Sequence, residues 1–246
     1  MPFVVANGVR TFYRAVGDGP PLLLIAGNGM DHTAFDEQLP SFGRHFRCIV
    51  YDLRGIGQSD VPSGGYTTPE MARDALALLD CLEIERAHVA GYSLGGAIGQ
   101  EMAASAPERV QSLSLYSSFD RPDPYLRLRY DLLVKILLEA SPEMWATFTA
   151  FSAFGIDYIN ANEATQLSLN TREQLTDQTD QSLAWLQSHN LGRHDRSGRR
   201  IDLNRNCRRR GIDVQQSEAC EIAGALRDMR EDQMPLRFAR DRRSCP

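Results

Sequence analysis

The stretch Ala87-His88-Val89-Ala90-Gly91-Tyr92-Ser93-Leu94-Gly95-Gly96 decides the fold class. It starts as an apolar run typical of a buried strand, passes through G-x-S-x-G and opens a segment with helical spacing. A serine between a strand and a helix sits on a tight turn with strained torsion angles, so its near neighbours must be small. Gly91, Gly95 and Gly96 meet that demand. The pattern predicts a nucleophile elbow that projects the Ser93 hydroxyl above a sheet.

The segments around this elbow alternate between strand and helix patterns. Residues 21–25 (PLLLI), 47–51 (RCIVY) and 110–116 (VQSLSLY) are predicted strands, and the first two are apolar enough to be buried on both faces. A helix is expected from near Thr68, which can act as its N-cap while Pro69 takes the first helical position. An opening hairpin is expected to turn at Asn7-Gly8. The order predicts an α/β fold with a mostly parallel sheet and helices on both faces.

Three regions follow from the patterning. Residues 1–123 form the predicted core, and residues 124–190 carry helical spacing without strand signals, which is typical of a helical lid over such a sheet. Residues 191–246 are rich in arginine and contain no run like that of residues 21–25. We expect this last segment to be poorly packed and the C-terminal strands of the sheet to be incomplete.

The arginine content suggests a reason for the change. The chain has 27 Lys and Arg residues together, and all of them are arginine except Lys135. Arginine is concentrated after residue 191. A GC-rich gene that is read in the wrong phase yields many arginines. One hypothesis is therefore that residues after 191 are encoded by a shifted frame that returns near Asp232. The alternative is a genuine but divergent C-terminal segment, and the encoding DNA distinguishes the two.

Composition excludes several classes of protein. A formal net charge of −5 gives no electrostatic reason to bind nucleic acid or an anionic membrane. No apolar run approaches the length of a membrane span, and no signal peptide is recognised, so we expect a cytoplasmic protein. The five cysteines have neither disulfide-framework nor zinc-ligand spacing. The sequence says nothing about the oligomeric state.

Residues 3–125 resemble the α/β-hydrolase superfamily. The resemblance is carried by residues 22–29 (LLLIAGNG), 51–60 (YDLRGIGQSD) and 91–96 (GYSLGG). It is strongest to the small-molecule branch that contains 3-oxoadipate enol-lactonases, aminoacrylate hydrolases and cofactor-free haloperoxidase-like esterases. Members of this branch usually have His-Gly after the first buried strand, where this chain has Ala26-Gly27.

The resemblance implies an active site built on Ser93. The N–H of Leu94, at the start of the following helix, can stabilise a developing oxyanion. The second oxyanion donor implied by the family is the backbone N–H of Asn28, and it does not depend on the missing histidine side chain. Asp52 and Arg54 are expected to organise the loop after their strand rather than to take part in chemistry.

The rest of a Ser–His–acid triad is hard to find. Asp232 matches the family acid faintly, and Asp120 is an alternative because some members place the acid after the strand that ends near residue 116. The general base is unknown. His189 and His194 are the histidines after Ser93, and both are expected to be exposed polar residues. His88 precedes Ser93 inside a strand and is expected to be structural.

The implied chemistry is acyl transfer to water on a small ester, lactone or related carbonyl compound, without a metal or an organic cofactor. Because no histidine occupies the expected place, the chain as given is expected to turn over esters little or not at all. Two alternatives remain: a non-catalytic pseudohydrolase that keeps the pocket as a binding module, and a truncated product that lacks the catalytic histidine.

Overall fold

The computed structural model describes residues 2–120, 123–141, 144, 147–148, 151, 159–160 and 213–217. The strands are β1 (Phe3–Ala6), β2 (Val9–Val16), β3 (Pro21–Ile25), β4 (Arg47–Tyr51), β5 (Ala87–Tyr92), β6 (Val110–Tyr116) and β7 (Asp213–Ser217). The helices are α1 (Leu39–Phe42), α2 (Thr68–Cys81), α3 (Leu94–Ser105) and α4 (Pro124–Glu139), with short 3-10 turns at η1 (His32–Phe35) and η2 (Pro107–Arg109). Among these residues, no helix is both long and apolar enough to cross a membrane.

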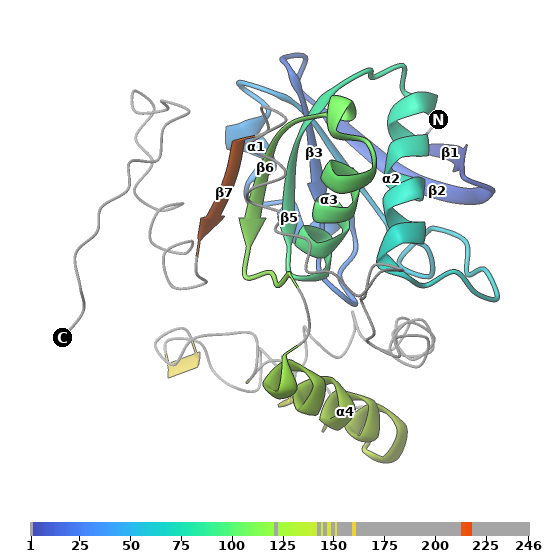
Figure 1. The fold of residues 1–246 in the computed structure, drawn as a ribbon, viewed down its shortest axis with the longest axis vertical. Coiled ribbons are helices and arrows are strands. Elements are labelled where there is room, and N and C mark those ends of the chain that lie inside the picture. Colours follow the sequence, from blue (N-terminus) through green and yellow to red (C-terminus); the bar gives the residue numbers. More distant parts are fainter. Residues whose placement is uncertain are drawn as a thin grey trace.

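The strands form one seven-stranded sheet in the order β1-β2-β4-β3-β5-β6-β7 (Figure 1). The pairs β1–β2 and β2–β4 are antiparallel, whereas β4, β3, β5, β6 and β7 are parallel neighbours. This confirms the predicted mostly parallel sheet. Asn7 and Gly8, with φ of 49° and 77°, make the turn between β1 and β2. Positive φ at both central residues matches this strand twist, which explains the predicted Asn-Gly hairpin.

Strands β3 and β4 are buried on both faces, as their apolar runs predicted. Successive residues alternate between two cores: Leu23 and Ile25 belong to the core that includes α2 and α3 residues, while Leu22 and Leu24 belong to a smaller core that includes Leu39 of α1. Period-two alternation sends neighbouring side chains to opposite faces of a strand. Each fully buried side chain of this size stabilises the fold by about 1.5–3 kcal/mol. Packing on both faces therefore fixes the position of β3, whose C-terminal end leads into the loop of Asn28.

The N-cap of helix α2 lies one residue before the predicted one. Thr67, not Thr68, is the N-cap: its backbone is extended, and its hydroxyl accepts a hydrogen bond from the N–H of Glu70. Thr68 is buried as the first helical residue and Pro69 follows it. Two consecutive threonines offer the same hydroxyl, and the extended backbone at Thr67 decides which one caps.

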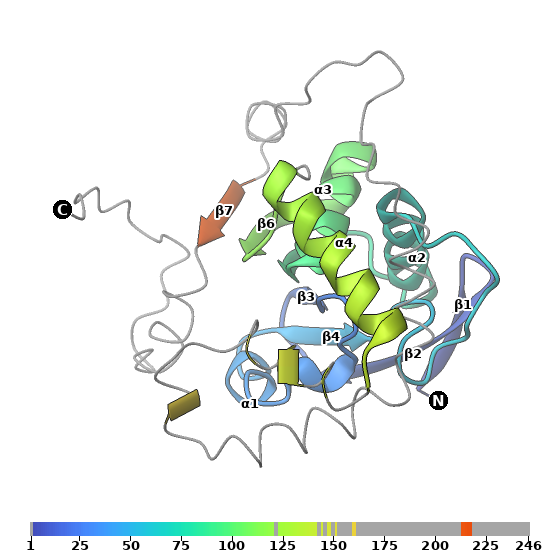
Figure 2. The same cartoon turned by 90° about the horizontal axis from the view of Figure 1, so that it is seen from below.

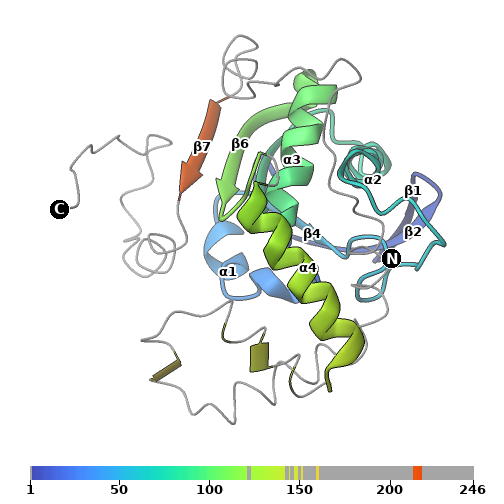
Figure 3. The same cartoon turned by 60° about the horizontal axis from the view of Figure 1, so that its bottom comes forward.

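Helix α4 lies beyond the C-terminal ends of β5 and β6, as two further views show (Figures 2 and 3). Its N-cap is Asp123, whose side chain accepts from the N–H of Leu126 at 2.7 Å. Tyr130 of α4 is buried and meets the ring of Phe119 at a centroid distance of 6.4 Å. The predicted helical character thus holds for residues 124–139. The remainder of residues 124–190 lies largely outside the described residues.

Strand β7 lies in the segment that was expected to be poorly packed. No apolar run like that of residues 21–25 follows residue 191, yet β7 pairs in parallel with β6 over residues 213–217. The expected incompleteness of the C-terminal strands concerns residues outside the described ones. The sequence of β7, DVQQS, has a single apolar residue, so it lacks the run used to recognise buried strands. Backbone pairing along β6 does not require apolar side chains, which is why the pattern was missed. The other residues of 191–246, including the arginine-rich stretch, lie outside the described residues.

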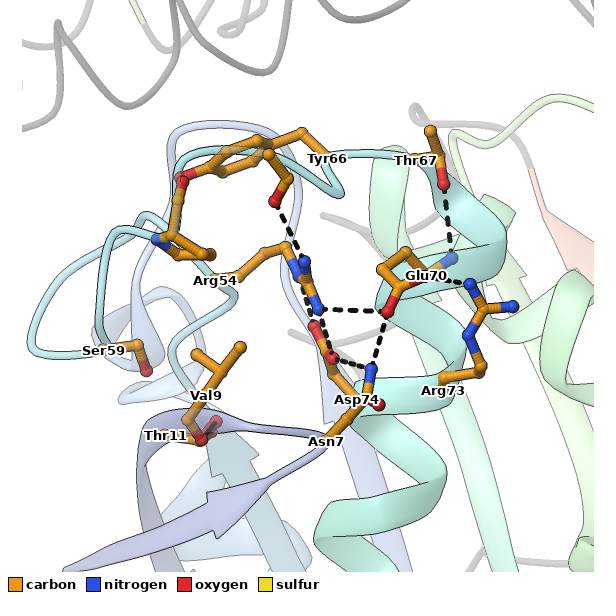
Figure 4. A network of polar contacts seen from close by, with 12 residues as sticks. Asn7, Val9, Thr11, Arg54, Ser59, Tyr66, Thr67, Glu70, Arg73 and Asp74 are labelled. Carbon is orange, nitrogen blue, oxygen red and sulfur yellow. Dashed lines mark hydrogen bonds and ion pairs between the residues drawn. The ribbon is translucent and has the colours of Figure 1, made fainter.

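A buried polar network joins the hairpin, the loop after β4 and helix α2 (Figure 4). Arg54 is 6% exposed and binds Asp74 through two hydrogen bonds of 2.6 Å each. Its third contact is the carbonyl of Gly64 at 3.1 Å. Asn7 donates to both Glu70 and Asp74 at 2.8 Å. A buried guanidinium is tolerated because it is paired and hydrogen-bonded, so Arg54 organises this loop as predicted.

Candidate active site

The G-x-S-x-G segment forms a sharp turn between β5 and α3. Ser93 has φ 52° and ψ −112°, outside the regions open to ordinary L-residues, and α3 begins at the next residue. The Ser93 N–H donates to the carbonyl of Tyr116 in β6 at 2.9 Å. A non-glycine residue with such torsion angles costs about 1–3 kcal/mol, which the surrounding structure has to offset. The serine is half-buried at the C-terminal edge of the parallel sheet.

The glycines around Ser93 are there because no other residue fits. A Cβ atom on Gly91 would lie 2.4 Å from the carbonyl carbon of Gly95, and one on Gly95 would lie 2.0 Å from the oxygen of Ile25. A Cβ on Gly96 would lie 2.4 Å from the hydroxyl oxygen of Ser118. Real carbon atoms do not approach oxygen this closely, so the steric reason predicted for these glycines is confirmed. The strand and the helix meet at backbone contact distance.

The loop after β3 reaches the same place. The close approach of Gly95 to the Ile25 and Ala26 carbonyls sets the start of α3 against the end of β3. Gly27 lies beneath the ring of Tyr92, where a Cβ would be 3.0 Å from the nearest ring carbon. A small cavity opens beside this junction, and it is lined by Asn28, Gly29, Leu53, Arg54, Ile56, Met71 and Leu94. Both residues expected to supply oxyanion donors, Asn28 and Leu94, therefore line one cavity.

A buried carboxylate secures the far end of this loop. Asp52 is fully buried at the end of β4. One of its oxygens accepts from the N–H of His32 at 2.7 Å and contacts the His32 ring nitrogen Nδ1 at 2.8 Å. Its other oxygen accepts from the N–H of Gln58 at 2.8 Å. These contacts support the predicted structural role of Asp52. They also identify His32, which precedes Ser93 in the chain and therefore lies outside the order expected for a catalytic histidine.

His32 is not a partner of Ser93. Its ring packs on Phe12 of β2, with centroids 4.6 Å apart. In the sheet, β2 and β4 lie on the opposite side of β3 from β5, so the His32–Asp52 pair sits away from the elbow. The signal that could have found His32 is its place in the loop that follows β3, four residues after Asn28.

The predicted acid and base residues divide into two groups. Asp120 is described: it is exposed, two residues after Ser118, and it makes no ion pair or hydrogen bond with another described residue. Asp232, His189 and His194 all lie outside the described residues. No described residue donates to or accepts from the Ser93 hydroxyl, so the general base is not among the residues brought together here.

His88 has the structural role expected of it. Its Nδ1 lies 2.7 Å from the hydroxyl of Ser112 on β6, and its ring meets that of Phe46 edge to face at 5.8 Å. Burial lowers the pKa of His88 because the charged imidazolium loses its hydration there. The ring belongs to the face of the sheet on which Leu22 and Leu24 pack. Among the described residues, no group of His, Cys, Asp and Glu side chains could hold a metal ion.

Comparison with known proteins gives a consistent result. The family model for the alpha/beta hydrolase fold matches residues 20–153. A protein of Azorhizobium caulinodans that carries the name carbamate hydrolase RutD is 37% identical over 145 residues, which are 59% of this chain and 55% of that protein. A protein of the same name from Pseudomonas syringae is 34% identical over 146 residues, 59% of this chain and 56% of that protein. The chain thus spans little more than half the length of these curated relatives.

Solved structures extend the likeness beyond that region. A hydrolase from Pseudomonas aeruginosa is similar with a TM-score of 0.69 and 26% identity, covering 91% of this chain and 94% of that one. The enol-lactonase of Burkholderia xenovorans has a TM-score of 0.68 and 23% identity, covering 92% and 96% respectively, which shows a shared fold. The family match covers more than half of the residues and includes the strained serine turn. The chain therefore belongs to the α/β-hydrolase fold family.

Proposed function

We propose that this chain is a serine hydrolase for a small ester, lactone or related carbonyl compound, with Ser93 as the nucleophile. One observation carries the proposal: Ser93 is held at φ 52° and ψ −112° at the edge of the sheet. Strained residues persist where the surrounding structure holds them, and they cluster at functional sites. Three glycines with no room for a side chain maintain the turn. A structural serine would need none of this.

The proposed reaction begins with attack of Ser93 Oγ on the substrate carbonyl carbon while a general base takes the hydroxyl proton. The carbonyl oxygen becomes negative and accepts hydrogen bonds from the N–H groups of Leu94 and Asn28. The leaving group departs with a proton, and water then cleaves the acyl-Ser93 ester in a second pass through the same steps. This chemistry needs no metal and no organic cofactor.

A small acyl group suits the surroundings of these donors. The cavity that Asn28 and Leu94 share is small and has mostly apolar walls from Leu53, Ile56 and Met71; Arg54 also lines it, whereas Ser93 lies outside its lining. An apolar wall favours a compact uncharged group next to the reacting carbonyl. The relatives named carbamate hydrolase RutD support the same size class, because a carbamate is a small carbonyl compound. We therefore include carbamates among the candidate substrates.

A second candidate is a non-catalytic binding protein that keeps the pocket. The observation that favours it concerns the described histidines, His32, His45 and His88. His32 is held by Asp52 and His88 contacts Ser112, while His45 is exposed just after α1 and before β4. In the described part of the chain, therefore, no imidazole is available to Ser93. Full hydrolytic turnover needs a base that no described residue supplies, and His189 and His194 are the histidines that follow Ser93 in the sequence.

Labelling with a fluorophosphonate distinguishes the two candidates. The reagent forms a covalent bond to a serine hydroxyl that is both exposed to small molecules and nucleophilic. The hydrolase proposal expects a single adduct, mapped to Ser93 by peptide mass spectrometry and absent from Ser93→Ala. A folded protein that takes up no label over many hours would favour the binding protein.

A further inference from the structure

The loop after β6, residues 117–119, is bonded directly to the elbow. The hydroxyl of Ser118 donates to the carbonyl oxygen of Ser93 at 2.8 Å. The same oxygen accepts from the N–H groups of Gly96 at 3.1 Å and Ala97 at 3.3 Å. On the other side of the residue, the Ser93 N–H donates to Tyr116 at 2.9 Å. Both backbone polar groups of the strained serine are therefore held from β6 and the loop that follows it.

A buried glutamine completes this arrangement. Gln100 of α3 is 4% exposed, and its Nε2 contacts the carbonyl of Phe119 at 3.0 Å, that of Gly96 at 3.2 Å and the Ser118 hydroxyl oxygen at 3.5 Å. The two N–H groups of Nε2 are matched by the shorter contacts to Phe119 and Gly96, so Gln100 ties α3 to the loop whose Ser118 hydroxyl donates to the Ser93 carbonyl. Helix α3, which follows the elbow, thus contacts the loop after β6.

The loop stores strain of its own. Ser117 has a φ of 47°, and it is one of four non-glycine residues with positive φ among the described residues. Its hydroxyl oxygen is buried and has no hydrogen-bond partner within the described part of the chain. Two strained serines, Ser93 and Ser117, thus follow the ends of neighbouring strands. An unpaired buried hydroxyl and unfavourable torsion angles each cost free energy, so the contacts of Ser118 and Gln100 have to offset both.

We propose that Ser118 and Gln100 are positioning residues that hold Ser93 in its strained conformation through the Ser93 carbonyl. We call these contacts of Ser118 and Gln100 the Ser118–Gln100 clamp. Its effect on the reactivity of Ser93 rests on the proposed function, whereas the contacts themselves are part of the fold. The Ser93 torsion angles decide where Oγ points and where the next N–H, that of Leu94, lies. Removal of the Ser118 hydroxyl lets the Ser93–Leu94 peptide rotate toward an ordinary conformation, which separates Oγ from the oxyanion donor.

The test compares Ser118→Ala with Ser118→Thr, Gln100→Met and the control Ser112→Ala. Threonine keeps the hydroxyl, and methionine keeps the length of the glutamine without its N–H groups. Ser112 lies on the same strand, β6, and also loses one hydrogen bond, to His88, but not to the elbow. Three properties are measured: fluorophosphonate labelling rate at Ser93, amide hydrogen exchange at Ser93, Gly96 and Ala97, and melting temperature.

We expect Ser118→Ala and Gln100→Met to slow labelling by about tenfold and to speed exchange of the three elbow amides by a similar factor, as expected for one lost hydrogen bond. Ser118→Thr should restore both properties toward wild type. Ser112→Ala should change neither, although its melting temperature should fall as much as that of Ser118→Ala.

Two results would overturn the proposal. The first is amide hydrogen exchange at Ser93, Gly96 and Ala97 that is unchanged in Ser118→Ala. The second is faster exchange of these amides with a wild-type rate of fluorophosphonate labelling, which would show that the Ser118–Ser93 hydrogen bond is only structural. If the wild-type protein takes no label, the proposed function fails. The clamp is then judged on amide exchange at the three elbow residues, where faster exchange supports it and unchanged exchange refutes it.

Discussion

The α-carbon of Gly95 packs against the carbonyl of Ile25 so closely that a Cβ atom would lie 2.0 Å from its oxygen. This contact joins the start of α3 to the end of β3, and it sets the loop of Asn28 against the elbow. A methyl group there has no flexible side chain to displace, because the neighbouring atoms belong to the backbone of a central strand.

We therefore predict that Gly95→Ala lowers the free energy of unfolding by about 3 kcal/mol or more, at the upper end of what overpacking costs. Urea denaturation measures this directly. Gly64→Ala is the matched control, since a Cβ there meets no atom within 4 Å. If both variants unfold at the wild-type midpoint, the close packing at the elbow is not as described.

The Arg54–Asp74 pair is predicted to contribute to stability through its burial. Arg54→Met leaves the Asp74 carboxylate, 4% exposed, without its bidentate partner, so the unfolding free energy should fall by about 3–5 kcal/mol. Arg73→Met is the control: Arg73 bonds Glu70 from the exposed side of α2, and its loss should cost under about 1 kcal/mol. Equal effects of the two variants would show that the network of Figure 4 is not buried in solution.

The sequence anticipated the parts of this molecule that depend on local patterns. The elbow follows from small residues at two fixed positions around Ser93, and the hairpin follows from Asn7-Gly8, so both were predictable. The role of Ser118 was not, because it comes from a contact with Ser93 between the segments that follow two separate strands, 25 residues apart. His32 was missed for a similar reason, as its partner Asp52 is 20 residues away.

Strand β7 marks another limit. A strand is recognisable from sequence when burial demands apolar residues on one or both faces. Val214 is the single apolar residue of β7, and what defines the strand is its backbone register with β6, where Leu113 pairs with Val214. Pairing of this kind leaves no trace in composition. Residue patterns alone therefore placed the start of the sheet correctly and missed its last described strand.

His88 is predicted to make stability depend on pH. Burial lowers its pKa from the ordinary value of 6.5, so the unfolded chain binds a proton more readily than the folded one. The unfolding free energy should therefore fall as pH drops below about 6.5, until the folded form is also protonated. Urea denaturation at pH 7.5 and pH 5.5 measures the difference. The difference should shrink in His88→Gln and persist in His45→Gln, which replaces an exposed histidine; the reverse pattern would refute this assignment.

Steady-state hydrolysis of p-nitrophenyl acetate is predicted to be slow. No histidine occupies the place in the sequence that the family resemblance implies for the base, and removing the base from a serine triad costs several orders of magnitude in rate. The purified chain should therefore stay within about tenfold of Ser93→Ala, the residual catalysis coming from the oxyanion donors. A large Ser93-dependent rate would contradict this prediction. If such a rate then disappeared in His189→Ala or His194→Ala, that variant would identify the base.

The central claim is that Ser93 is a nucleophile, and trapping its acyl intermediate tests that claim most directly. p-Nitrophenolate is a good leaving group, so acylation of Ser93 makes the smaller demand on a general base. Hydrolysis of the acetyl-Ser93 ester must expel the serine alkoxide and depends on the base more strongly, so the acyl-enzyme should accumulate. The protein is mixed with p-nitrophenyl acetate, quenched in acid and examined by intact and peptide mass spectrometry. We predict one acetyl group per chain, located on Ser93 and absent from Ser93→Ala. An unmodified Ser93 in folded protein, or acetyl groups found equally in Ser93→Ala, would contradict the account.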